Sequence, residues 1–218
     1  MYLIIKRALD ILISFIGAII LLPLFLALII AIKVDSEGPI LFKQKRVGKD
    51  VTYFNILKFR TMRIDTPKDT PTHLLDNPER YITKVGKFLR KTSLDELPQV
   101  FNILSGDMSI IGPRPALWNQ YDLVAEREKY KANGVKPGLT GLAQINGRDE
   151  LSIKEKAELD GEYVENIGPC MDIKCFYGTI ISVLKGEGVV EGGTGNVEKA
   201  VSETDVIEKE IHKEISRI

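Results

Sequence analysis

The stretch that decides the fold class is ILISFIGAIILLPLFLALIIAI, from Ile11 to Ile32, which contains no charged residue. A helix of about 20 apolar residues crosses a bilayer, so this stretch is long enough to enter a membrane. It is longer than the apolar region of a cleaved signal peptide, and no small-residue cleavage site follows it. A buried core helix is the alternative that the stretch itself leaves open.

Basic residues on both sides of the apolar stretch bear on its topology. Lys6 and Arg7 precede it, and further lysines and an arginine follow it between residues 33 and 49. Positive charge marks the cytoplasmic side of a membrane segment, so both flanks favour the same side. Pro23 lies at the middle of the stretch, where it would interrupt a helix. Kinked spanning helices also contain proline, but Pro23 and the two basic flanks together favour a re-entrant membrane helix.

The rest of the chain has the composition of a polar globular domain. Of 218 residues, Lys+Arg and Asp+Glu number 30 each, so no overall charge points to nucleic acid as a partner. Alternating apolar and polar residues on either side of Gly48-Lys49-Asp50 predict a β-hairpin with arms at 40–47 and 51–61. Helical periodicity and breakers predict helices at 81–90, 96–104, 117–133, 153–166 and 172–184, and a glycine-rich loop at 136–147.

We therefore predict an α+β fold, a mainly helical membrane-associated domain with a small β-hairpin. The expected organisation is a re-entrant membrane helix at 1–35, a cytoplasmic catalytic domain at 36–190, and a linker with a C-terminal amphipathic helix at 191–218. That last helix has a narrow apolar stripe among charges, which is typical of contact with a partner helix. A homodimer is one arrangement that would use it.

A pair of adjacent acids lies in TSLDELPQVFNIL, from Thr92 to Leu104. If Asp95 caps a helix that begins at Glu96, Pro98 falls at the third helical position, where no backbone hydrogen bond is lost. Gly106 then ends the helix. Capping requires only Asp95, so the second acid needs another explanation.

Adjacent acids near several basic residues have three interpretations. Asp95 and Glu96 could form structural salt bridges. They could hold Mg²⁺, which takes one or two carboxylates and completes its shell with substrate phosphates. One of them could be a nucleophile that forms an acyl-phosphate. The last two interpretations are compatible, because one acid can attack phosphorus while its neighbour holds the metal.

Basic residues in four places could bind phosphate beside these acids. Arg114 is the most informative, since prolines at 113 and 115 restrict its backbone and preorganise the guanidinium for phosphate oxygens. The candidates are Lys58, Arg60, Arg90, Arg114 and Arg148.

Several motifs resemble those of one family, the bacterial sugar transferases, which are monotopic polyprenyl-phosphate phosphoglycosyl transferases. The resemblance extends from about Lys6 to about Gly186, and the chain looks like the short form that consists of the catalytic domain alone. The motifs are KRALDI, KFRTM, TSLDELPQVFNILSGDMSIIGPRP, KPGLTGLAQINGR and ELDGEYVENIGPCMDIK.

The resemblance implies a membrane helix broken near its centre, with the globular part on the cytoplasmic face of the bacterial inner membrane. It implies transfer of a sugar 1-phosphate from a UDP-sugar to undecaprenyl phosphate, with Mg²⁺. Asp95 would attack the β-phosphorus, expel UMP and hold the phosphosugar covalently, and Glu96 would be the metal ligand.

The resemblance also implies roles for other residues. Arg90 and Arg114 would bind phosphates, while Lys58, Arg60 and Arg148 would bind the nucleotide or the rest of the donor. Asp172 matches an acidic position of the family, and Lys6 and Arg7 would meet lipid headgroups. Many members have Ser-Pro at the break of the membrane helix, whereas this chain has Leu22-Pro23. The residues alone leave a membrane-anchored scaffold without catalytic activity and a phosphatase as alternatives.

Overall fold

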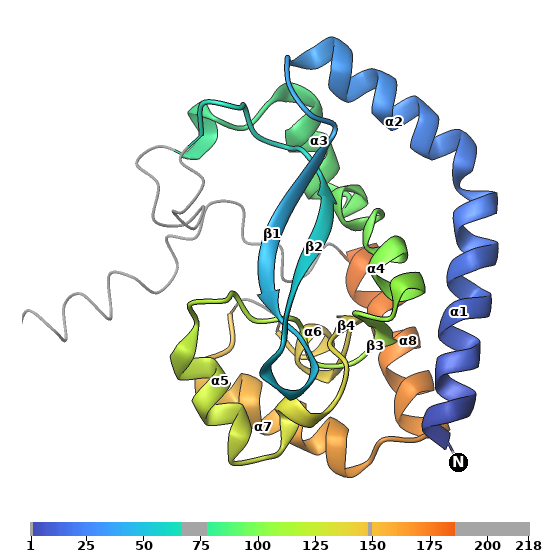
Figure 1. Cartoon of the computed structure of the whole chain (residues 1–218), viewed down its shortest axis with the longest axis vertical. Helices are drawn as coiled ribbons and strands as arrows, with labels where there is room; N and C mark the ends of the chain where they lie inside the picture. The colour runs from blue at the N-terminus through green and yellow to red at the C-terminus, as the bar shows by residue number, and fades with distance from the viewer. Residues whose placement is uncertain (1, 67–77, 148–149, 186–218) are drawn as a thin grey trace, which may run out of the picture.

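The computed structural model describes residues 2–66, 78–147 and 150–185. Helices predominate in this part of the chain, and the strands form two separate pairs (Figure 1). The elements are α1 (Tyr2–Ile20), α2 (Leu22–Asp35), β1 (Leu41–Val47), η1 (Lys49–Val51), β2 (Tyr53–Phe59), η3 (Pro78–Arg80), α3 (Lys84–Lys91), η4 (Leu94–Glu96), α4 (Gln99–Ser105), β3 (Ser109–Ile111), α5 (Tyr121–Glu128), η5 (Ala132–Gly134), β4 (Gly138–Thr140), α6 (Leu142–Ile145), α7 (Ile153–Glu165) and α8 (Pro169–Lys185).

The apolar stretch forms a bent pair of helices along one side of the molecule (Figure 1). None of the described helices alone is long and apolar enough to cross a bilayer, but α1 and α2, bent by 62°, have the length and composition to do so together. The break falls at Leu21, two residues before Pro23, which has no backbone N–H to continue the ladder. The predicted break is therefore confirmed, although Leu22 rather than serine precedes the proline.

Helix α1 turns its polar residues inward and its apolar residues outward. Lys6, Asp10 and Ser14, spaced four apart on one face, are buried, while most of the large aliphatic side chains of α1 are exposed. Lys6 donates to Asp172 of α8 (2.7 Å). Asp10 accepts from the Ser109 hydroxyl (2.8 Å) and from the backbone N–H of residue 110 in β3 (3.0 Å). The inner face of α1 is thus held by polar contacts, and the outer face needs an apolar environment.

Helix α2 attaches to the other end of the globular part. Phe25, Leu28 and Ile32 are buried against Phe59 of β2 and Leu89 of α3. At the end of α2, Asp35 accepts a hydrogen bond from the backbone of residue 85 in α3 (3.0 Å). Both ends of the bent pair are therefore fixed to the same body.

The predicted β-hairpin is confirmed. Strands β1 and β2 pair antiparallel from Leu41 opposite Phe59 to Val47 opposite Tyr53. One edge of the hairpin contacts the segment after β3, through a bridge between Arg46 and Leu117. The other edge contacts α4 through Asn102, which is described below. The hairpin is thus held between the two segments that carry the remaining site residues.

Strands β3 and β4 form a parallel pair, and β4 lies where the sequence predicted only a glycine-rich loop. Ser109 is opposite Gly138, and Ile111 is opposite Thr140. Helix α6, with α7 and α8, covers the pair in a second buried cluster that includes Leu142, Tyr163 and Cys175. The prediction of a loop at 136–147 was wrong, because a strand of three residues has no measurable periodicity. Its glycines do not mark a loop here; they allow the backbone to pass close to the segment after β3.

The remaining helices follow the predicted pattern with one exception. Helices α3, α7 and α8 confirm the predictions, and the Ser152 capping box begins α7. The helix predicted at 117–133 is only α5, because the N–H groups of residues 129–131 bond to carbonyls three residues back and Lys131 adopts a left-handed conformation (φ 57°). The predicted C-terminal amphipathic helix lies outside the described residues.

We expect Asn102→Ala to destabilise the fold by about 1–3 kcal/mol, because the buried Asn102 amide bonds the Leu57 N–H and the Asn55 carbonyl, both at 2.9 Å. Chemical denaturation in detergent micelles would measure the change. Ser105→Ala on the same helix is the control: the residue is exposed, and its hydroxyl donates to the Asn102 carbonyl (3.0 Å) and to Asp107 (2.8 Å) near the surface, so we expect a change below about 0.5 kcal/mol. Equal effects of the two substitutions would contradict this account of how β2 is held to α4.

Candidate active site

The acidic pair, Asp95 and Glu96, lies in a short 3₁₀ turn and not at the start of a regular helix. This turn, η4, follows Ser93, whose backbone is left-handed (φ 55°). Helix α4 begins only after Pro98. The prediction of a helix capped by Asp95 was therefore wrong at its beginning, although Gly106 ends the helix as expected (φ 98°). Proline suits the cap position because its N–H is not required there.

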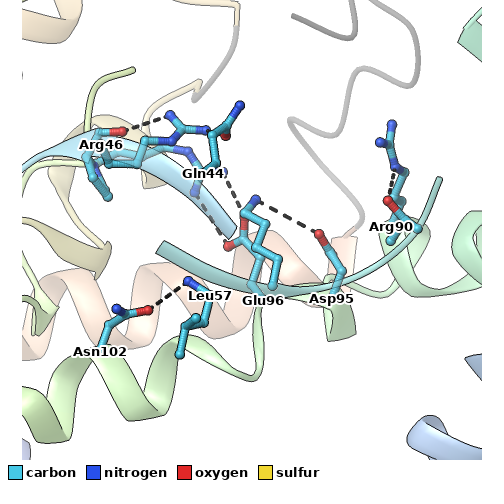
Figure 2. Close-up of polar contacts among 11 residues, drawn as sticks. Gln44, Arg46, Leu57, Arg90, Asp95, Glu96 and Asn102 are labelled. Atoms are coloured by element: carbon cyan, nitrogen blue, oxygen red, sulfur yellow. Dashed lines mark hydrogen bonds and ion pairs between the residues drawn. The ribbon is translucent and has the colours of Figure 1, made fainter. Parts of the chain in front are cut away.

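Glu96 is the centre of the charged cluster in Figure 2. Its buried carboxylate accepts hydrogen bonds from Lys58 Nζ (2.8 Å) and Arg114 Nη2 (2.8 Å), both at Oε1. Lys58 comes from β2, and Arg114 from the corner after β3. The structure thus brings together three predicted residues from three distant segments.

Asp95 lies in a different environment from its neighbour. Its side chain is 14% exposed, and its ion pair with Lys58 is long, with Nζ 3.9 Å from Oδ2. Within the described ranges, no group donates a hydrogen bond to the Asp95 carboxylate. Burial raises the pKa of Asp95, and the charge of Glu96 adds to this, while Lys58, Arg90 and Arg114 oppose it. Asp95 is thus a desolvated carboxylate beside cations that bind it only weakly.

The backbone at Arg114 is held by contacts to two successive carbonyls, its own and that of Pro115. Arg127 donates to the Arg114 carbonyl (2.9 Å), and Arg46 donates to the Pro115 carbonyl (3.0 Å). Arg127 is itself fixed by a buried ion pair with Asp160 (2.6 Å). These contacts add to the restriction by the two prolines, so the guanidinium is presented by a rigid corner.

Arg46 and Arg127 were not among the predicted site residues. The predicted hairpin could have identified Arg46. Residues 42 and 46 lie on the same face of β1, and Lys58 is opposite Phe42, so Arg46 and Lys58 lie on the same face of the hairpin. Nothing in the sequence around Arg127 marks it as a support for Arg114. Its role depends on the packing of α5 against α7, which the sequence does not specify.

Two other predicted residues, Arg90 and Arg60, lie in different places. Arg90 donates to the Thr61 hydroxyl (2.9 Å), and Figure 2 shows Asp95 between Arg90 and Glu96. Arg60 is buried, and its guanidinium donates to the carbonyls of residues 36 and 37 at the end of α2. Arg90 is thus part of the cluster, whereas Arg60 fixes the connection between α2 and β1.

The remaining predicted residues lie at the base of α1 or outside the described ranges. Asp172 accepts hydrogen bonds from Tyr2 (2.6 Å), Lys6 (2.7 Å) and Tyr163 (2.8 Å). Arg7 donates to the two carbonyls at the end of α4. The structure therefore joins Asp172 to α1 and not to the acidic pair, while headgroup contact by Lys6 and Arg7 stays a prediction. Arg148 is not among the described residues.

The cluster has the charge and the ligand types that a phosphorylated substrate and a hard cation require. Lys58, Arg90 and Arg114 exceed the two carboxylates by one positive charge. Mg²⁺ binds through one or two carboxylates together with substrate phosphates, and Asp95 and Glu96 offer such a pair. In the described part of the chain, no group of three or more His, Cys, Asp or Glu side chains converges on a metal position. Asp95 and Glu96 could thus supply part of the ligands of such a cation.

Comparisons with known proteins show that the sequence is similar to the bacterial sugar transferases. A model of the bacterial sugar transferase family matches residues 1–186. The uncharacterized sugar transferase EpsL of Bacillus subtilis is 40% identical over 183 residues, which cover 84% of this chain and 88% of EpsL. The UDP-glucose:undecaprenyl-phosphate glucose-1-phosphate transferase of Escherichia coli is 40% identical over 188 residues, 80% of this chain and 39% of that protein.

A third relative is the UDP-N-acetylgalactosamine-undecaprenyl-phosphate N-acetylgalactosaminephosphotransferase of Aeromonas hydrophila, 39% identical over 193 residues. These residues cover 86% of this chain and 45% of that protein. The chain thus spans most of the length of EpsL and less than half of the other two relatives.

We expect Asp95→Asn to raise the thermal unfolding midpoint at pH 8. The pKa of Asp95 is higher in the folded state than its ordinary value of 3.8. The folded protein therefore holds this proton more tightly than the unfolded chain, and stability falls as the pH rises from 3.8 through the folded-state pKa. The asparagine variant avoids that cost, which is about 1.4 kcal/mol for each unit of pKa difference. The gain should shrink as the pH falls toward 4.

Asp65→Asn is the matched control, because Asp65 is an exposed carboxylate paired with Arg63. Its unfolding midpoint should follow that of the wild type at every pH. A destabilised Asp95→Asn variant at pH 8 would show that the carboxylate is well solvated or well paired in the folded protein.

Proposed function

Because this chain belongs to the bacterial sugar transferase family, we propose that it transfers a sugar 1-phosphate from a UDP-sugar to a polyprenyl phosphate such as undecaprenyl phosphate, with release of UMP. The names of the relatives from E. coli and A. hydrophila specify reactions of this class with two different sugars. The observation that carries the proposal is the pair of adjacent carboxylates in unlike environments, beside cations that suit a diphosphate.

The reaction would proceed in two displacements at the β-phosphorus of the donor. In the first, an Asp95 oxygen forms a bond to phosphorus, and the bond from phosphorus to the oxygen bridging to UMP breaks. UMP leaves with the electron pair. In the second, a phosphate oxygen of the lipid attacks the same phosphorus, and the Asp95 carboxylate leaves. Atoms and charges balance without a further reactant, and the product is a polyprenyl diphosphate sugar.

The environment of Asp95 supports its role as the nucleophile. A carboxylate that lacks hydrogen bonds from the described residues and is largely removed from water does not have to break strong contacts before it attacks. Its raised pKa has the same origin, because the charged form is poorly stabilised. Glu96 is bonded to two cations at 2.8 Å and is therefore the less reactive of the pair.

The cations around the pair would neutralise the charge that develops on the phosphates. Arg114 offers a rigid planar donor set, and Lys58 lies within reach of both carboxylates. We propose that Asp95 and Glu96 also provide ligands to Mg²⁺, which would neutralise phosphate charge when bound. Glu96 is the principal ligand in this proposal, since Asp95 must be able to attack.

A lipid acceptor requires the site to lie at a membrane. The exposed apolar faces of α1 and α2 support such a location. The outer faces of α1 and α2 expose aliphatic side chains. Both ends of the pair are fixed to the same globular body, α1 through Asp10 and Lys6 and α2 through Asp35. We propose that the pair enters a bacterial membrane and leaves it on the same side, with the catalytic domain on the cytoplasmic face.

Asp95→Asn should reduce UMP release from a UDP-sugar by at least about a thousandfold, because it removes the attacking oxygen. It should also abolish acid-labile labelling of the protein by a donor that carries ³²P at the β-phosphorus. The measurement is a UMP-release assay over a panel of UDP-sugars with Mg²⁺ and undecaprenyl phosphate, together with gel analysis of the trapped protein.

Asp65→Asn, far along the chain and exposed, should retain wild-type release and labelling. Full turnover by Asp95→Asn would exclude the covalent route. Release of free sugar phosphate without the lipid would instead identify a phosphatase, and the absence of nucleotide-dependent thermal stabilisation would favour a scaffold.

For the topology, cysteines placed at Leu3 and Val34, which are exposed near the two ends of the helix pair, should behave alike. In intact cells, neither should react with a membrane-impermeant maleimide, and both should react in inverted vesicles. The background is a Cys170→Ser, Cys175→Ala variant, and a separate Cys175→Ala protein that keeps the exposed Cys170 marks the catalytic domain. Labelling of the Leu3 position alone in intact cells would show a spanning segment.

A further inference from the structure

The amide of Gln144 has no hydrogen-bond partner for either of its polar atoms. The residue is 9% exposed, and both Oε1 and Nε2 are buried without a partner among the described residues. A buried polar group that lacks a partner costs about 1–3 kcal/mol. Directly after the same short helix, the amide of Asn146 donates to the Leu142 carbonyl (2.7 Å). The unpaired amide of Gln144 therefore needs an explanation that the backbone of α6 does not supply.

The position of Gln144 in the fold relates it to the charged cluster. Strands β3 and β4 are parallel, so their carboxyl ends lie at the same edge. Arg114 follows the carboxyl end of β3 and binds Glu96. Gln144 follows the carboxyl end of β4 and lies in α6. Ligands of open parallel sheets bind outside the carboxyl ends of the strands, and both residues belong to the segments that leave this edge.

Close backbone approach shows how near the two segments are. Gly112 N donates to the Thr140 carbonyl (2.8 Å) across the ends of the strands. A side chain at Gly141 would collide with the Gly112 carbonyl and would lie 3.0 Å from Oε1 of Gln144. Oε1 of Gln144 thus lies close to the backbone of Gly112, two residues before Arg114. The glycines at this junction keep the space between the two loops free of side chains.

We propose that Gln144 is a specificity-determining residue that hydrogen-bonds a polar edge of the nucleotide sugar bound at Arg114. This inference rests on the proposed function for the class of the ligand, and it adds a residue that neither charge nor nucleophilicity would identify. A carboxamide presents one donor and one acceptor side by side. The N–H and C=O of uracil, or two neighbouring sugar hydroxyls, provide the complementary pair.

The energetics favour ligand binding over a structural role. An amide that stabilised the fold would have partners in the protein, as Asn102 and Asn146 do. An unpaired amide lowers stability in the free protein and recovers this cost when the ligand arrives. A site built to hydrogen-bond a substrate discriminates strongly against analogues that lack the matching group. Gln144 would thus contribute to selection of the donor rather than to the rate of phosphoryl transfer.

Gln144→Leu tests the proposal, because leucine has a similar volume and no polar atoms. We expect KM for UDP-glucose or UDP-N-acetylgalactosamine to rise at least about tenfold, with kcat changed by less than about threefold. The unfolding midpoint without ligand should be unchanged or higher, since the unpaired amide is gone. The stabilisation that each UDP-sugar gives in thermal unfolding should fall in parallel with the rise in KM.

Thermal stabilisation by UMP identifies which part of the donor is bound. Loss of stabilisation by both UMP and the UDP-sugar assigns Gln144 to the uracil, whereas loss for the UDP-sugar alone assigns it to the sugar. Thr179→Val is the matched control, because it removes hydrogen bonds to Thr140 (2.6 Å) and the Cys175 carbonyl (2.7 Å) in the same layer. This control should lower stability and leave KM unchanged.

Unchanged ligand stabilisation in Gln144→Leu would overturn the inference, as would a lower unfolding midpoint that matched that of Thr179→Val. These readouts measure binding and do not require turnover. Failure of the wild type to release UMP would therefore count against the proposed function alone.

Discussion

The carboxylate of Glu96 is the point on which the arrangement of the site depends. It joins the 3₁₀ turn η4 to the hairpin through Lys58 and to the corner after β3 through Arg114. The three segments share no local sequence, so their relative positions are set by this buried charge and by the packing beneath it. Removing one partner from such a group leaves an uncompensated charge, which costs more than the pair itself contributes.

Asp95 and Glu96 show how one turn of chain can give two identical functional groups different properties. The left-handed Ser93 starts a turn that directs Glu96 toward two cations and leaves Asp95 beside Lys58 at 3.9 Å. Glu96 is bonded to two cations at 2.8 Å, whereas Asp95 has only the long ion pair with Lys58. Burial raises the pKa of Asp95 although Lys58, Arg90 and Arg114 lower it, and this environment suits the nucleophilic role proposed for Asp95.

The sequence predicted the features that depend on local pattern. The apolar stretch, its break near Pro23, the hairpin and three of the helices follow from periodicity and breakers, and the charged residues Lys58, Arg90, Asp95, Glu96 and Arg114 do lie together. The helix start at Glu96 and the loop at 136–147 were wrong, because a left-handed serine and a three-residue parallel pair leave no periodic signal. The supports of Arg114 and the contacts of Arg60 depend on tertiary packing, which no local pattern encodes.

The bent helix pair is fixed at both of its ends, and this has a mechanical consequence. Its angle of 62° cannot open without loss of the Asp10 contacts to β3 or of the Asp35 contact to α3. These contacts therefore fix the angle between α1 and α2, and with it the depth to which the pair would enter a membrane. In the proposed membrane placement, the surrounding lipids would have to adjust their own thickness and packing to its shape, at a cost of fractions of a kcal/mol for each ångström of mismatch.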